Sequence, residues 1–188
     1  RDLRMSRGLG DVYKRQFVSQ LEKTISHPYL QTTVREMQKT LYPVTKQTSY
    51  RLPEGKATDI FRRIIAPYAG KVLFVDFWAT TCAPCRQGIQ ATAKLREQYR
   101  NHPGFQFVYI TSEAESPEKA YAEYVEKHLK GEACFRLTDT EYKYMRELFQ
   151  FNGIPHYLVV EKDGSISTEQ VGTYNLADFL KKRFGDSH

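Results

Sequence analysis

Residues 71–88 of the chain read KVLFVDFWATTCAPCRQG, and this stretch decides the fold. It opens with the apolar run VLFV at 72–75, which is typical of a strand buried on both faces of a sheet. Two threonines follow, and Cys82 and Cys85 then stand where helical periodicity begins, with Pro84 in the first turn, where helices tolerate proline. A helix beginning at Cys82 places its free N–H groups and positive dipole end beside the first sulfur. A thiol in that position ionises more easily, and the thiolate is the reactive form.

The Cys-x-x-Cys spacing also fits half of a zinc site or a structural disulfide. Zinc needs two further ligands, and the sequence holds neither a second Cys-x-x-Cys nor a closely spaced pair among its five histidines. A second motif, Gly153-Ile154-Pro155, stands far downstream, after a predicted helix and before the apolar run at 157–160. The strand, the helix and this second motif together favour a redox pair, and we expect no metal site.

The stretch VDFWATTCAPC at 75–85 resembles the active-site strand and turn of the thioredoxin superfamily. The residues FWAT at 77–80 and the extended domain around them resemble the TlpA-like (ResA-like) thiol–disulfide oxidoreductases of the bacterial envelope. The resemblance covers about residues 57–184. Residues 153–155 resemble the cis-proline loop that faces the dithiol in this superfamily, which predicts a cis bond before Pro155. Thr81 is a departure, because many relatives carry Trp there; this change alters the surface on which partners dock and leaves the redox pair intact.

The composition allows one domain with a proper core and an appendage, because the chain has 188 residues. Its three cysteines are too few for a disulfide scaffold and fit a catalytic pair plus one spare. Half of the net charge of +6 lies in residues 1–16, and the remainder shows no clustered basic stripe, so we expect no nucleic-acid binding. No apolar run approaches the ~20 residues of a membrane span.

The N-terminal part is predicted to be separate from the main domain. Residues 1–16 resemble the translation of a transposon-based sequencing adapter, and we interpret them as a non-native leader. Residues 17–50 are predicted as a helical extension and linker, either the tail of a missing upstream region or a membrane-proximal or dimerising stalk. Residues 51–188 form the thioredoxin-like domain. Any membrane attachment is expected only through a missing N-terminus, and the sequence gives no oligomeric state.

The order of the predicted elements indicates an α/β fold with a mixed central sheet flanked by helices, and with a helix inserted after the second strand. Ser116 and Pro117 mark the start of that inserted helix, with Ala120 and Leu129 on its buried face. Asn175 is expected to cap the last helix. Helices are predicted at 57–67, 82–99, 117–129, 140–151 and 176–184, and strands at 72–75, 105–110, 134–137, 157–160 and 165–171.

Cys82 is expected to attack a substrate disulfide, because it stands at the helix start, and Cys85 to resolve the mixed disulfide. Asp76 matches the buried acid of thioredoxin and is interpreted as the proton acceptor for Cys85; the alternative is a buried carboxylate satisfied by its neighbours.

The resemblance implies that the substrate lies against Trp78, the Ala83-Pro84 dipeptide and the Ile154-Pro155 peptide, although core packing explains Trp78 equally well. His156 is interpreted as a surface histidine, and Cys134 as a small buried hydrophobe.

The predicted function is a periplasmic thiol–disulfide oxidoreductase that reduces protein disulfides and receives electrons from an upstream donor. Its only redox group is the Cys82–Cys85 disulfide, with no further cofactor. A peroxiredoxin-like thiol peroxidase and a redox-inert interaction domain remain as alternatives. Ala83-Pro84 offers no positive charge to stabilise the thiolate further, which favours a reductant.

Overall fold

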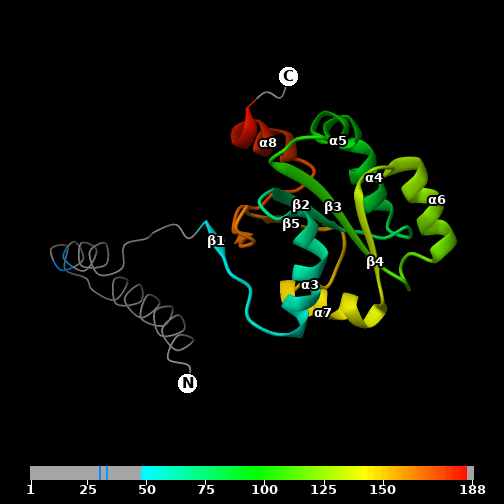
Figure 1. Ribbon diagram of the computed structural model, residues 1–188, viewed down its shortest axis with the longest axis horizontal. Coiled ribbons are helices and arrows are strands. Elements are labelled where there is room, and N and C mark those ends of the chain that lie inside the picture. Colours follow the sequence, from blue (N-terminus) through cyan, green and yellow to red (C-terminus); the bar gives the residue numbers. More distant parts are fainter. Residues whose placement is uncertain (1–29, 31–32, 34–47, 186–188) are drawn as a thin grey trace. The chain divides into compact units, whose positions relative to one another are not determined.

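The computed structural model describes Leu30, Thr33 and residues 48–185 (Figure 1). The leader at 1–16 and most of the extension at 17–50 lie outside the described residues, so both stay predictions. The compact unit that carries the sheet begins at Thr48. Its first strand is Ser49–Tyr50, two residues before the boundary expected at 51.

A six-stranded mixed sheet forms the centre of this unit, with the strand order β1-β6-β5-β2-β3-β4. The central strand β2 pairs in parallel with β3 on one side and antiparallel with β5 on the other. β4 extends the sheet in parallel beyond β3, and β6 and β1 extend it antiparallel beyond β5. This arrangement confirms the predicted α/β class. The strands are β1 Ser49–Tyr50, β2 Val72–Phe77, β3 Phe105–Ser112, β4 Ala133–Leu137, β5 His156–Val160 and β6 Ile166–Ser167.

Helices cover both faces of the sheet, because β2 is buried along its whole length and its alternate side chains enter two different cores. α3 (Lys56–Ile65) and α7 (Asp139–Phe149) cover the face that receives Leu73, Val75 and Phe77. The opposite face packs against α4 (Ala83–Ala91), α5 (Ala93–Tyr99), α6 (Glu118–His128) and α8 (Leu176–Phe184). Figure 1 shows the sheet between these two helical layers.

The helix predicted over 82–99 is divided into α4 and α5 at Thr92. The Thr92 hydroxyl donates to the carbonyl of Gly88 at 3.0 Å, one turn back, and lies 3.2 Å from that of Ile89. A hydroxyl that bonds back to the preceding turn competes with the helical ladder and bends the helix. The Arg96 guanidinium, one turn after the break, also donates to the Ile89 carbonyl, so both side chains bond to the backbone before the break.

The start of α6 differs from the prediction. Ser116 is not the residue that caps the helix; Pro117 is the residue before α6, and no side chain caps it. The Ser116 hydroxyl is buried and bonded to groups outside the helix, so it is not available as a cap. Ala120 is exposed, contrary to the prediction, whereas Leu129, the residue directly after α6, is fully buried as predicted.

The C-terminal hairpin is shorter than the predicted strand at 165–171, because β6 contains only Ile166 and Ser167. The turn before it is formed as predicted, with Gly164 at φ 80° and its N–H bonded to the carbonyl of Glu161. Asn175 precedes α8 but does not cap it with its side chain, which instead accepts a hydrogen bond from the N–H of Gly172 at 2.8 Å.

We predict that Phe61→Ala lowers the free energy of unfolding by about 3–5 kcal/mol, the usual cost of removing a buried aromatic ring. Phe61 is fully buried and meets the ring of Phe149 edge-on at 4.8 Å, which joins α3 to α7. Urea denaturation followed by circular dichroism measures the change, and Phe61→Leu serves as a control with a smaller loss. A loss below about 1 kcal/mol would show that the contact between α3 and α7 adds little.

Candidate active site

The two cysteines lie at the carboxyl end of β2, where the chain turns into α4, and a disulfide joins them. Cys82 occupies the N-cap position, and its Sγ accepts a hydrogen bond from the N–H of Cys85 at 3.2 Å. Cys82 is partly exposed, whereas Cys85 is 0 % exposed. Cys82 therefore stands at the helix start, as predicted, and is the more accessible of the two sulfurs.

The proline loop lies beside the disulfide. The Ile154–Pro155 bond is cis, as predicted, and the carbonyl oxygen of Ile154 lies 3.8 Å from the Sγ of Cys82. Ile154 and Pro155 are partly exposed, and Ala83 and Pro84 are exposed. The structure thus gathers four of the five residues proposed to contact a substrate at one surface around Cys82.

Trp78 is the fifth of these residues, and it is 0 % exposed. Its ring lies 5.1 Å from that of Tyr124 and 6.3 Å from that of Tyr121, so α6 covers it. This position corresponds to the core-packing alternative and removes the side chain from the substrate surface. The indole Nε1 has no hydrogen-bond partner among the described residues.

Asp76 lies on the same face of β2 as Trp78, the face that also receives Cys85. It is 1 % exposed, and its neighbours in the sheet register are Tyr109 on β3 and Tyr157 on β5. Burial raises the pKa of Asp76 well above its usual value, and the positive charge of Arg96 opposes this rise only in part. One carboxyl oxygen, Oδ1, has no hydrogen-bond partner in the described part of the chain.

Arg96 was not identified by the sequence analysis, although it is 4 % exposed and lies on the Asp76 side of the sheet. Its guanidinium lies 5.9 Å from the centre of the Tyr109 ring and 4.0 Å from Glu132. It also donates to the carbonyl of His128 at 3.0 Å. Its place in the buried stripe Ile89, Thr92, Arg96 and Tyr99 was the available signal, because an arginine at such a position needs polar partners inside the fold.

His156 and Cys134 take no direct place at the disulfide. His156 is half-buried and stacks on Phe151 with ring centres 4.4 Å apart, and burial lowers its pKa. It is therefore less exposed than the surface histidine that we expected. Cys134 is a free, partly buried cysteine on β4, and burial raises the pKa of its thiol to about 12. A thiol with such a pKa stays protonated and unreactive at neutral pH.

Within residues 48–185 and the two described positions before them, no three His, Cys, Asp or Glu side chains are grouped as metal ligands. The helices in the same part of the chain are all too short or too polar to cross a membrane.

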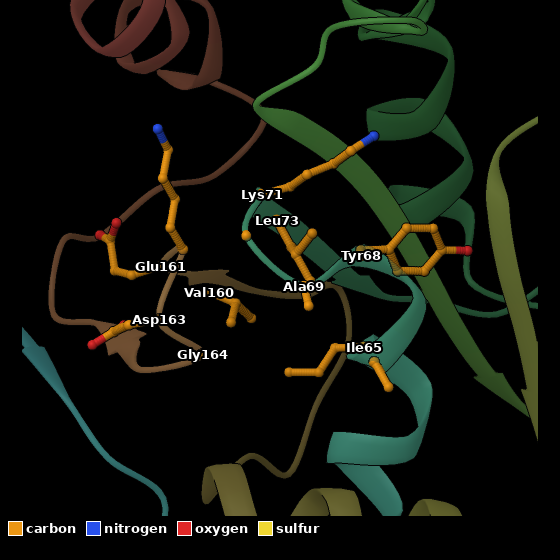
Figure 2. Close-up of a pocket in the computed structure, with 12 residues that line it drawn as sticks. Ile65, Tyr68, Ala69, Lys71, Leu73, Val160, Glu161, Asp163 and Gly164 are labelled. Carbon is orange, nitrogen blue, oxygen red and sulfur yellow. The ribbon is translucent and has the colours of Figure 1, made fainter.

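A pocket of about 190 Å³ lies at the opposite end of β2 from the disulfide, between the segment before that strand and the β5–β6 turn (Figure 2). Lys71, Glu161 and Asp163 line it together with apolar residues, but none of its lining residues belongs to the disulfide site.

Comparisons with known proteins agree with this geometry. The model of the thioredoxin-like family matches residues 70–166. Thioredoxin-like protein YneN of Bacillus subtilis (strain 168) is 27 % identical over 113 residues, which are 60 % of this chain and 64 % of that protein. The chain thus spans less than two thirds of the length of this relative.

Two solved structures from Bacteroides vulgatus have a similar fold. One is a putative thiol-disulfide oxidoreductase with 26 % sequence identity and a TM-score of 0.52, and the match covers 73 % of this chain and 87 % of that one. The other is the thioredoxin domain of a thiol-disulfide oxidoreductase, with 21 % identity, a TM-score of 0.54 and coverage of 63 % and 83 %. The predicted thioredoxin-like fold is therefore confirmed.

We predict that Asp76→Asn raises the free energy of unfolding at pH 7. The folded-state pKa of Asp76 is raised, so its ionisation costs stability as the pH increases from the unfolded-state pKa towards the folded one. Each unit of that rise corresponds to ~1.4 kcal/mol. Because asparagine does not ionise, the gain in unfolding free energy should be present at pH 7. It should disappear below about pH 4, where the Asp76 carboxyl is protonated in both the folded and the unfolded protein.

Urea denaturation between about pH 4 and 8 measures this difference. The exposed Glu123→Gln on α6 is the matched control, and we expect it to leave the pH dependence unchanged. A constant difference between Asp76→Asn and the unsubstituted protein at every pH would contradict the raised pKa.

Proposed function

Because the chain belongs to the thioredoxin-like family, we propose that it is a thiol–disulfide oxidoreductase that reduces protein disulfides through Cys82 and Cys85. The observation that carries the proposal is the placement of the two sulfurs. Cys82 is partly exposed at the N-terminus of α4, and Cys85 is fully buried directly behind it. A partner can therefore reach the first sulfur, and only the first sulfur can reach the second.

In the reduced protein, the Cys82 thiolate attacks one sulfur of a substrate disulfide, and the other substrate sulfur leaves as a thiolate. This step forms a mixed disulfide. The Cys85 thiolate then attacks Cys82, forms the intramolecular disulfide and releases the second substrate thiol. The disulfide between Cys82 and Cys85 is the product of this sequence, and a dithiol donor must return two electrons to it.

The N-terminus of α4 acts on the ionisation of Cys82, and Asp76 acts on that of Cys85. The N–H of Cys85 and the positive end of α4 favour the thiolate at Cys82. Cys85 is buried and must lose its proton before it can attack, and Asp76 is the buried carboxyl on the same face of the sheet. A raised pKa brings a carboxyl closer to the neutral range in which it can accept and return a proton.

If Asp76 accepts the proton of Cys85, Asp76→Asn slows turnover but not the alkylation of Cys82. Unchanged turnover between about pH 6 and 9 would contradict this role of Asp76.

The surface around Cys82 suits an extended polypeptide. Ala83 and Pro84 are exposed beside the sulfur, and the cis Ile154–Pro155 peptide presents its carbonyl oxygen 3.8 Å from it. Backbone groups bind a peptide without regard to its sequence, so the site suits varied protein disulfides. The relatives named above are bacterial, and we propose that this protein acts in the cell envelope, where protein disulfides persist.

We predict that the protein reduces the disulfides of insulin in the presence of dithiothreitol. Cys82→Ser lowers the rate to that of dithiothreitol alone, because the exposed nucleophile is lost. Pre-reduced Cys85→Ser, mixed with insulin after dithiothreitol has been removed, accumulates the mixed disulfide that it cannot resolve. Cys134→Ser is the matched control and retains the activity, because this thiol is partly buried and protonated. The rate of insulin precipitation and the mass of the trapped adduct are the measurements.

Other outcomes of this assay point to the alternatives. Full activity in Cys82→Ser together with loss in Cys85→Ser would reverse the two roles. An inactive unsubstituted protein that consumes hydrogen peroxide would indicate a thiol peroxidase. A protein that does neither would be a redox-inert interaction domain.

We also predict a reduction potential closer to the ~−270 mV of thioredoxin than to the ~−120 mV of DsbA. Strong oxidants of this kind stabilise their reduced form with further charges near the thiolate, and Ala83 and Pro84 carry none. A buried acid such as Asp76 further disfavours a second negative charge at the pair. Equilibration with glutathione buffers measures the potential, and a value above about −180 mV contradicts a reductant.

A further inference from the structure

We propose that the loop of residues 113–117, between β3 and α6, is the element that positions Cys82, and that the Ser116 hydroxyl is its central positioning residue. This inference rests on the proposed attack by Cys82. Neither the cysteine motif nor the proline loop includes this segment. It lies more than thirty residues further along the chain from Cys82, and the fold brings it against the two residues that precede the nucleophile.

Ser116 holds the backbone of Thr80, two residues before Cys82. The N–H of Thr80 donates to the Ser116 hydroxyl at 2.9 Å, and that hydroxyl shares a hydrogen bond of 2.7 Å with the hydroxyl of Thr111 on β3. All three residues are buried. The Ser116 hydroxyl therefore has a hydrogen-bond partner on each side, and the two partners together fix its orientation.

The same loop also forms hydrogen bonds with the side chains of Thr80 and Thr81. The hydroxyls of Thr80 and Thr81 donate to the carbonyl of Glu115, at 3.3 and 3.1 Å. From the other side, the Arg86 guanidinium donates to the carbonyl of Thr80 at 2.5 Å. Both backbone groups of Thr80 are therefore bonded to side chains. The position directly before Cys82 therefore holds a threonine that is bonded back to this loop.

The loop itself is fixed at three points, two on α7 and one on β4, so it can act as a rigid support. The N–H of Ala114 donates to Asp139 at 2.9 Å, at the start of α7. The Arg136 side chain on β4 donates to the carbonyl of Ser116 at 2.8 Å. Glu115 forms an ion pair of 2.8 Å with Arg146 on α7. Displacement of the loop would break contacts with all of these elements.

The physical consequence concerns the thiolate of Cys82. Its sulfur is stabilised by the N–H of Cys85 and the start of α4, and that geometry depends on where the chain enters the helix. If Thr80 loses its partner, a buried N–H is left unsatisfied, and the entering segment shifts to find another partner or water. The sulfur then lies less well over the helix terminus, the pKa of Cys82 rises, and less of it is thiolate at neutral pH.

The test measures the alkylation of Cys82 by iodoacetamide in the reduced protein, followed by peptide mass spectrometry, from about pH 5 to 10. We expect Ser116→Ala to slow the reaction about three- to tenfold at pH 7, which corresponds to a rise of ~0.5–1 unit in the pKa of Cys82. At about pH 10, where the thiol is ionised in both proteins, the two rates should converge. Thr81→Val, at an exposed position that carries little risk to folding, should slow the reaction less and in the same direction.

Ser165→Ala is the matched control. Ser165 is also a buried serine with a hydroxyl hydrogen bond, to Asp163 at 2.6 Å, but it lies in the β5–β6 turn away from the disulfide. We expect a similar loss of stability and an unchanged alkylation profile. Equal profiles for Ser116→Ala, Thr81→Val and the unsubstituted protein overturn the proposal, and so does an equal shift in Ser165→Ala.

Alkylation needs no disulfide substrate, so its result is independent of the proposed function. An inactive unsubstituted protein in the insulin assay overturns the oxidoreductase activity, whatever the alkylation rates are. Normal insulin reduction with unshifted alkylation in Ser116→Ala overturns only the role of the loop.

Discussion

Burial of β2 on both faces is the constraint on which the rest of the structure depends. All six of its residues are buried, between β3 in parallel and β5 antiparallel, so helices must cover the sheet on both sides. The carboxyl end of β2 leads into α4, and the proline loop before β5 lies at the same end of the strand. The disulfide lies at this edge, with one sulfur at the surface and the other in the core.

The same burial gives the site its electrostatic character. A carboxyl in a strand that is buried on both faces is costly to ionise, because it is removed from water. This raises the pKa of Asp76. Two buried acids, Asp76 and Glu132, interact with the buried guanidinium of Arg96, and Glu132 is also 3.9 Å from Arg100. Glu132 therefore has the nearer positive partners, while Asp76 retains an oxygen without a hydrogen bond. An unsatisfied polar atom costs stability, and such costs are expected mainly where function requires them.

The inserted segment around α6 links the core to the reacting sulfur. Its tyrosines cover Trp78, which thereby becomes part of the core below the site. The loop that leads into the helix reaches Thr80 and Thr81 just before Cys82. The loop before α6 thus contacts the short segment between β2 and α4, and α7 in turn holds this loop through Asp139 and Arg146. A change in the loop or in Arg146 acts on the sulfur through hydrogen bonds, without touching it.

The sequence by itself determined the central strand and the cysteine pair at a helix start, because each follows from a pattern within a few residues. The order of the predicted elements gave the mixed sheet, and the resemblance of residues 153–155 to a known loop gave the cis proline. Only the tertiary structure decided which polar residues support the site. Ser116 reads locally as a helix cap, but its hydroxyl is bonded to Thr80 and Thr111. Arg96 shares a helical stripe with the buried Ile89 and Tyr99, but only the fold supplies the partners that satisfy it there, Glu132 and the carbonyl of His128. The physical reason is the same in both cases: a buried polar group is fixed by partners that are distant in the chain, and local periodicity contains no record of them.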